Sequence, residues 1–167
     1  MLELLTDEAA LRHTSADAIA ALTRRATAAT YLTDGLTSDE VGFIARVVRI
    51  SGDSVASAAG AAHQHLVTAT SGGALAGFVI ATIHAEDSRE LDLLMVDPAF
   101  HGSGIAAPLM RAGIAWLGED RPMWLNVVRH NARAIGFYRK HGFEIDPDTA
   151  CPHAMPHWIM RRGQSSP

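Results

Sequence analysis

ELDLLMVDPAFHGSGIAAPLM, at residues 90–110, is the stretch that decides the fold. An apolar strand pattern at its start runs into a glycine-rich turn, residues 101–106, and an amphipathic helix pattern follows the turn. Glycines allow a backbone to approach a ligand closely, and the free N–H groups in the first turn of a helix point toward an anion. The turn is therefore a candidate cradle for a pyrophosphate.

A second informative stretch, HNARAIGFYRKHGF, covers residues 130–143 and fits the pattern N-x-x-A-x-x-x-Y-x-x-x-G-F. In the first stretch, VDP at 96–98 and the turn fit V-x-P followed by Q/R-x-x-G-x-G/A, with His101 at the Q/R position. In this order and spacing, the two patterns resemble the GNAT superfamily of acyl-CoA N-acyltransferases. Backbone N–H groups do most of the binding in such a cradle, so we expect cofactor binding to survive the change to His101.

The resemblance implies an α/β (α+β) fold: a GNAT-like mixed, mostly antiparallel sheet, flanked by helices and splayed at a central pair of parallel strands. The strands that contain Leu91 and Met123 would form this pair, and the splay would admit the pantetheine arm. In the first of these strands the apolar alternation fails over residues 93–96, as it would at a β-bulge or in a strand buried on both faces. The resemblance implies the bulge. We expect one domain over residues 1–162 and a tail over 163–167.

The resemblance also implies acetyl-CoA as cosubstrate and no metal. One backbone N–H group of the central strand would bind the thioester carbonyl and stabilise the oxyanion. The glycine turn would hold the pyrophosphate, and two side chains of the following helix would complete the site. The expected contacts are Leu94, Met95, Val96, His101, Gly102, Ser103, Gly104, Ile105, Ala106, Asn131 and Tyr138.

Tyr138 matches the residue that serves as general acid in the resembled family, where a phenol protonates the departing thiolate. Asn131, on the same helix face, would contact pantetheine and can also cap the helix. A base is needed as well, because a protonated amine cannot attack. Glu90 and Asp92 lie on one face of the predicted central strand and are the candidates, acting directly or through water.

Two other readings stay open. Gly102, Gly104 and Ala107 also spell the dinucleotide fingerprint G-x-G-x-x-A, but the acidic residue that a Rossmann unit places after the next strand is replaced by residues 126–128, NVV. A non-catalytic acyl-CoA-binding sensor or scaffold would keep the turn but would have no need of Tyr138. We therefore expect an N-acetyltransferase that acts on a primary amine by direct attack in a ternary complex.

Composition and net charge limit the classes of partner that the protein can bind. The chain has 167 residues, a formal net charge of −4 and 48% hydrophobic residues, so it can bury a core and has little attraction for nucleic acid or anionic membranes. The single cysteine, Cys151, cannot form an intrachain disulfide. The first residues lack a signal-peptide pattern. We expect a cytoplasmic protein, a small-molecule or peptide amine as substrate, and a homodimer as a possible assembly.

Local patterns predict the remaining elements. Thr14 with Asp17, and Thr37 with Glu40, form capping boxes before two helices. Residues 11–13 suggest a short first strand, and residues 51–62 suggest a connection or a frayed helix. The predicted strands are 65–70 and 75–84, joined as a hairpin, with 123–128 and 157–162 following later.

The acceptor would approach over two loops, residues 30–36 and 147–156, with Tyr31 and Asp34 as candidate contacts. The second loop carries Cys151 and His153 shortly before His157. Three possible ligands without a fourth favour a solvated loop over a metal site.

Overall fold

The protein is described from a computed structural model that covers residues 1–31 and 35–163. The candidate contact Asp34 and residues 164–167 of the predicted tail lie outside the described residues. The elements in chain order are β1 (Leu2–Thr6), α1 (Asp7–His13), α2 (Ala16–Tyr31), α3 (Ser38–Gly60), β2 (Gln64–Ser71), β3 (Ala74–Ala85), β4 (Ser88–Val96), the 3-10 helix η1 (Pro98–Phe100), α4 (Ala106–Leu117), β5 (Met123–Val128), α5 (Ala132–Arg139), β6 (Glu144–Asp146) and β7 (His157–Arg162).

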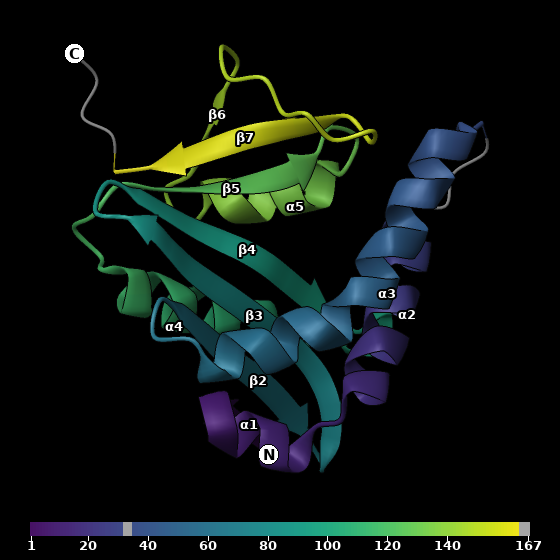
Figure 1. Ribbon diagram of the computed structural model, residues 1–167, viewed down its shortest axis with the longest axis vertical. Coiled ribbons are helices and arrows are strands. Elements are labelled where there is room, and N and C mark those ends of the chain that lie inside the picture. Colours follow the sequence, from purple (N-terminus) through teal and green to yellow (C-terminus); the bar gives the residue numbers. More distant parts are fainter. Residues whose placement is uncertain (32–34, 164–167) are drawn as a thin grey trace.

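The strands form one sheet in the order β1-β2-β3-β4-β5-β7-β6 (Figure 1). Neighbouring strands are antiparallel except β4 and β5, which are parallel. Within the described residues, the register between β4 and β5 contains a single pair, Glu90 with Trp124, and the strands diverge toward the carboxyl end of β4. This confirms the predicted sheet and its splay at the central parallel pair.

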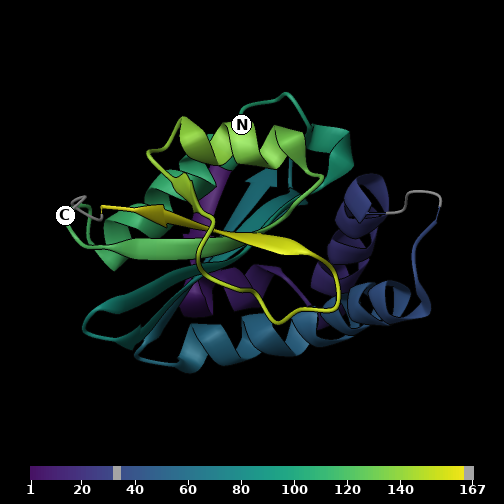
Figure 2. The same cartoon turned by 90° about the horizontal axis from the view of Figure 1, so that it is seen from above.

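Helices cover both faces of the sheet (Figure 2). One face packs against α4 and α5 through a core that includes Leu109 and Phe143, and the other packs against α1, α2 and α3 through a core that includes Phe78. Gly113 lets α4 approach closely, because a Cβ at that position would lie 2.5 Å from Leu91 Cδ2. This contact fixes α4, and the turn before it, against β4.

β4 contains the predicted bulge, but earlier in the strand than expected. Leu91 pairs with Ala81 and Leu93 pairs with Ile80, so Asp92 is the extra residue. Leu91 packs in the core under α4, whereas Leu93 packs against the opposite core. The alternation therefore slips at Asp92, because Leu91 and Leu93, two residues apart, pack on opposite faces of the sheet.

The helix boundaries follow local chemistry. Thr37 and Glu40 form the predicted capping box at the start of α3, and α4 starts at Ala106 and ends before Gly118, whose φ is 96°. Pro108 thus lies in the first turn of α4, where its missing N–H group costs no hydrogen bond. Among the described residues, no helix has the length and apolar character needed to cross a membrane.

Several local predictions are wrong. Residues 11–13 belong to α1, and the first strand is β1, which pairs with β2. Ser15, and not Thr14, accepts the capping hydrogen bond in the first turn of α2, from Ala18 N–H at 3.1 Å. Residues 51–60 continue α3 as a regular helix. The small side chains of this segment resemble a loop pattern, but they allow α3 to pack closely against its neighbours. A Cβ on Gly52, for example, would lie 2.9 Å from Ala16.

Candidate active site

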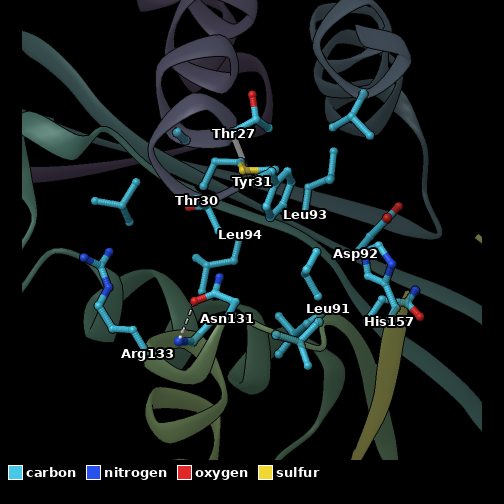
Figure 3. Close-up of a pocket in the computed structure, with 18 of the residues that line it drawn as sticks. Thr27, Thr30, Tyr31, Leu91, Asp92, Leu93, Leu94, Asn131, Arg133 and His157 are labelled. Carbon is cyan, nitrogen blue, oxygen red and sulfur yellow. Dashed lines mark hydrogen bonds between the residues drawn. The ribbon is translucent and has the colours of Figure 1, made fainter. Parts of the chain in front are cut away.

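A pocket of about 1440 Å³ lies between the diverging strands β4 and β5 (Figure 3). Two walls line it. The glycine wall comprises residues 101–102 and 104–106 of the turn, residues 94–96 of β4, and Asn131, Arg133 and Tyr138 around α5. The aromatic wall comprises Tyr31, Phe43, Asp92, His153 and His157. The volume exceeds the range of about 300–1,000 Å³ that is typical of small-molecule sites, so an elongated ligand and a second molecule can share the space.

The glycine turn has the backbone that its sequence predicts. Gly102 and Gly104 adopt φ values of 81° and 84°, which favour glycine. Apart from the glycine itself and its two chain neighbours, no described atom lies within 4 Å of the position that a Cβ would take at either glycine, so the space beside them is open. Ser103 is the predicted turn residue that does not line the pocket; its hydroxyl donates to the Phe100 carbonyl at 2.5 Å. The open turn and the first N–H groups of α4 suit an anion.

His101 has a cationic neighbour that the sequence reading missed. Arg133, in the first turn of α5, lies with Nη1 3.0 Å from His101 Nδ1, and a guanidinium can only donate in this contact. Burial and the charge of Arg133 lower the pKa of His101, so this imidazole is neutral at neutral pH. Arg133 therefore supplies the positive charge beside the glycine turn. The signal was present, since Arg133 follows Asn131 within the second motif stretch.

The β4 edge that faces the pocket carries backbone donors. Asp97 N–H donates to the Ala76 carbonyl at 2.9 Å, toward β3. Backbone directions alternate along a strand, so the Met95 N–H group also faces β3, while those of Leu94 and Val96 face the opening toward β5. Of the three predicted donors, Leu94 and Val96 have the orientation to reach a ligand in the pocket.

α5 brings the two predicted side chains of the second motif to the same wall. Asn131 caps the helix, with its Oδ1 accepting from Ala134 N–H at 3.1 Å, which leaves its Nδ2 group for other partners (Figure 3). Tyr138 lines the pocket from the next turns of α5. Burial, and then the neighbouring Tyr31, raise the pKa of Tyr138, so this phenol keeps its proton at neutral pH.

The two predicted carboxylates lie at the apex of the splay. Glu90 is buried and accepts from Asn126 Nδ2 at 3.2 Å, and its other oxygen lies 2.7 Å from His84 Nε2. Burial, and then the charge of Asp92, raise the pKa of Glu90 to about 7. Asp92 itself lines the pocket, and burial raises its pKa against the opposing charges of His84 and His153. Glu90 does not line the pocket, but it is hydrogen-bonded to Asn126, which does.

The aromatic wall is assembled from distant segments. Phe43 on α3 lies 5.3 Å from His153 and 5.4 Å from His157, measured between ring centroids. Tyr31, the candidate contact at the end of α2, packs in the same small core as Phe43, and burial raises its pKa. Phe43 was missed because no local pattern relates it to residues more than a hundred positions away. The wall presents flat apolar surface next to the Asp92 carboxyl group.

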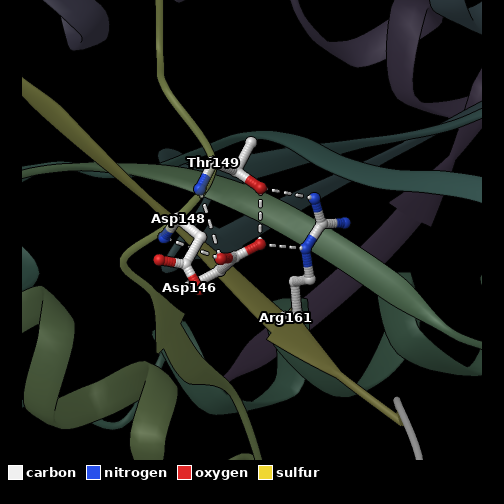
Figure 4. A network of polar contacts seen from close by, with 4 residues as sticks. All are labelled: Asp146, Asp148, Thr149 and Arg161. Carbon is white, nitrogen blue, oxygen red and sulfur yellow. Dashed lines mark hydrogen bonds and ion pairs between the residues drawn. The ribbon is translucent and has the colours of Figure 1, made fainter.

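A polar network holds the loop that carries His153 (Figure 4). Arg161 Nε donates to Asp146 Oδ2 at 2.6 Å, and Thr149 donates to the same oxygen at 2.6 Å. The hydrogen bonds from Arg161 and then Thr149 lower the pKa of Asp146 to about 2. The network ties the start of the loop to β7, beside the pocket.

Cys151 and its two histidine neighbours do not form a metal centre among the described residues, where no group of three metal-binding side chains was found. Cys151 Sγ instead donates to Asn126 Oδ1 at 3.3 Å. The loop is also less solvated than predicted, because Met155 is fully buried and His157 nearly so.

Curated relatives match part of this chain in sequence. An uncharacterized N-acetyltransferase of Mycobacterium tuberculosis is 34% identical over 83 residues, which are 48% of this chain and 53% of the relative. A mycothiol acetyltransferase of Mycolicibacterium gilvum is 35% identical over 80 residues, which are 44% of this chain and 26% of the relative. The chain thus spans about half the length, or less, of these curated relatives.

The fold and the family are clear from two further comparisons. The crystal structure of PaiA N-acetyltransferase from Thermoplasma acidophilum in complex with coenzyme A matches 97% of this chain and 98% of its own, with a TM-score of 0.74 and 20% identity, which establishes the shared fold. The family description "Acetyltransferase (GNAT) family" matches residues 36–143, a region that includes both motif stretches and β4. The chain belongs to the acetyltransferase (GNAT) family.

Proposed function

We propose that the protein transfers an acetyl group from acetyl-CoA to a primary amine of a small molecule or peptide, by direct attack in a ternary complex. The observation that carries this proposal is the single pocket in which the glycine turn, the open β4 edge, Tyr138 and Asp92 meet. Each group suits a different part of the same reaction.

Acetyl-CoA would lie along the glycine wall. Its pyrophosphate would accept hydrogen bonds from the N–H groups of the glycine turn, beside the Arg133 guanidinium. The pantetheine arm would follow the β4 edge, and Asn131 Nδ2 would donate to one of its carbonyl groups. In this arrangement the thioester would lie in the splay, near Leu94 and Tyr138.

The amine would enter along the aromatic wall as an ammonium ion, which the Asp92 carboxylate and the aromatic rings attract. It loses one proton to Asp92 or Glu90, directly or through water. The amine nitrogen then attacks the thioester carbon, and the N–H group of Leu94 or Val96 stabilises the oxyanion.

The leaving group then departs. The C–S bond breaks, its electron pair stays on sulfur, and the sulfur takes the Tyr138 proton. The second proton of the ammonium nitrogen restores the phenol. The products are an acetamide and the free CoA thiol, and each turnover releases one proton in total.

A thiol-release assay tests the proposal. The protein is incubated with acetyl-CoA and, in turn, a polyamine, an aromatic amine, an amino acid and a peptide with a free amino terminus. We expect acceptor-dependent CoA release, with the acetylated amine detected by mass spectrometry. Saturable acetyl-CoA binding without turnover of any amine would contradict the proposal and favour a sensor or scaffold.

A further inference from the structure

His84 lies directly behind the carboxylate at the apex of the splay. Its Nε2 is 2.7 Å from Glu90 Oε2, and on the other side Asn126, which lines the pocket, donates to Glu90 Oε1 at 3.2 Å. Hydrogen bonds thus run continuously from a pocket residue, through Glu90, to His84.

The two members of this pair differ in their access to solvent. The Glu90 side chain is 8% exposed, whereas the His84 side chain is 45% exposed. Glu90 does not itself line the pocket, so its carboxyl group is enclosed by protein. His84 is the member of the chain that reaches solvent, on the side of Glu90 away from the Asn126 contact.

The His84 ring is held in place. It stacks on Trp124, with ring centroids 5.9 Å apart and planes inclined by 20°, and Trp124 Nε1 donates to Ser88 Oγ at 3.4 Å. Trp124 is the residue that pairs with Glu90 across the two parallel strands. The ring orientation is therefore fixed by the same strand pair that positions the carboxylate.

The proposed reaction requires an exit for one proton per turnover. A buried carboxylate that accepts this proton must lose it before the next cycle. Histidine is suited to pass it on, because an imidazole changes its charge near neutral pH and has two nitrogens. When Glu90 is protonated, Nε2 can accept that proton from Oε2 and Nδ1 can release its own to water, which leaves Nε2–H donated to the ionised carboxylate.

We propose that His84 and Glu90 share one proton and that His84 delivers the proton released by the reaction from Glu90 to solvent, while its contact holds Glu90 in the ionised form that accepts a proton. The inference rests on the proposed acetyl transfer. His84 is a positioning and proton-transfer residue, since it does not line the pocket.

The groups around Glu90 act on its pKa in opposite directions. Burial, and then the charge of Asp92 on its own strand, raise the pKa of Glu90; the His84 hydrogen bond and charge, from β3, and the Asn126 hydrogen bond, from β5, lower it. His153, on the loop before β7, acts on Asp92, and Cys151 contacts Asn126. Removing His84 therefore raises the pKa of Glu90 and leaves more of it protonated at neutral pH.

The kinetic test compares His84→Gln with His65→Gln. His65 is a matched control outside the pocket, because its Nδ1 lies 2.9 Å from the Asp7 carboxylate and its ring stacks on Trp116. We expect His84→Gln to move the acidic limb of the kcat/KM profile for the amine upward by about one pH unit, about a tenfold loss below the limb. Acetyl-CoA affinity should stay within about twofold. His65→Gln should leave the profile unchanged.

Two further variants separate proton transfer from simple packing. His84→Ala should be slower than the wild type in dilute buffer and should regain activity with added imidazole, which can reach the exposed gap. In a Glu90→Gln background, His84→Gln should have almost no additional effect, because both changes act through one group. An unrescued His84→Ala variant, or independent losses that multiply, would overturn the proposal.

An NMR titration tests the His84–Glu90 pair without requiring acetyl transfer. The ring resonances of His84 are titrated by NMR in the wild type and in Glu90→Gln. A shared proton predicts that the His84 midpoint falls when Glu90 loses its charge, and an unchanged midpoint would overturn the pair. If no amine is acetylated by the wild type, the proposed function fails, while the NMR result still decides whether the pair shares a proton.

Discussion

The two walls of the pocket are built in different ways. The glycine wall comes from two short stretches, residues 94–106 and 131–138, and acts largely through backbone geometry. The aromatic wall joins α2, α3, the bulge in β4 and the loop before β7, and acts through side chains. A backbone site leaves a compact motif in the sequence, whereas a side-chain surface gathered from distant segments leaves none. Perturbing the two walls should therefore have separable effects on cofactor and acceptor.

The largest expected effect comes from Tyr138→Phe, which removes the proton donor and little else. We expect kcat to fall by about 100-fold, within the range for loss of general acid catalysis, because the thiolate departs unprotonated. Acetyl-CoA affinity should stay within about twofold. Tyr31→Phe, on the aromatic wall, should change the KM for the amine more than kcat. Steady-state kinetics on both variants decide this, and an unchanged kcat in Tyr138→Phe would remove it from the mechanism.

Gly104→Val should break the glycine wall alone. A β-branched side chain is strained at a φ of 84°, and its Cβ would occupy the open space beside the turn. We expect acetyl-CoA affinity to fall by about 100-fold, or about 3 kcal/mol.

Gly73→Val is the matched control for this variant. Gly73 has a φ of 80° in the turn between β2 and β3, and a Cβ there also meets no described atom within 4 Å. Its thermal midpoint should fall as much as that of Gly104→Val, with acetyl-CoA affinity retained. Equal loss of affinity in both variants would show that strain, and not the cradle, sets binding.

The pH dependence of kcat/KM tests the role of Glu90, the buried carboxylate near the apex of the splay. Because the pKa of Glu90 is raised to about 7, kcat/KM should rise with pH and level off above about 7 as Glu90 ionises. Glu90→Gln should remove this limb. If kcat/KM of Glu90→Gln still rises with pH over the same range, the group that ionises is another residue.

The stability of the fold should also depend on the ionisation of Glu90, but it should fall with rising pH where kcat/KM rises. The folded-state pKa of Glu90 lies above the unfolded value, so the stability contributed by the protonated form is present below the unfolded value of about 4.3 and is lost as the pH rises through about 7. Relative to Glu90→Gln, the thermal midpoint of the wild type should therefore fall between pH 5 and pH 8. Paired thermal melts across this range check the sign.

The smallest expected effect lies at the loop anchor beside the aromatic wall. Arg161→Lys loses the paired contacts from Nε to Asp146 and from Nη2 to Thr149, so the loop with His153 should loosen. We expect the KM for the amine to rise about threefold, less than 1 kcal/mol, with acetyl-CoA affinity unchanged. Arg162→Lys, whose contacts are to the carbonyls of His141 and Glu119, should leave both constants unchanged.

Much of the fold was predictable where one local pattern decided it. β5, β7, the Thr37 capping box and the start of α4 follow from alternation, caps and a proline in the first turn. Residues 51–60 were not, because small residues that serve close helix packing resemble a loop pattern. β6 was missed because a strand of three residues has no period, and its register with β7 is set by tertiary structure.

Some residues of the candidate site were likewise predictable from local motifs, and others were not. Its glycine turn, Asn131 and Tyr138 were predicted from motifs and line one pocket. The bulge was predicted, but its position at Asp92 required the register with β3. Phe43 and the partnership of His84 with Glu90 had no local signal, because each depends on chain segments that only the folded sheet brings together.

A calorimetric titration of the wild-type protein with acetyl-CoA, with NAD as a control, tests the assignment of the glycine wall most directly. We expect saturable binding of acetyl-CoA at one site, greatly weakened by Gly104→Val, and no binding of NAD. Failure of the wild type to bind acetyl-CoA, or saturable binding of NAD in its place, would contradict the assignment of the glycine wall and with it the proposed acetyl transfer.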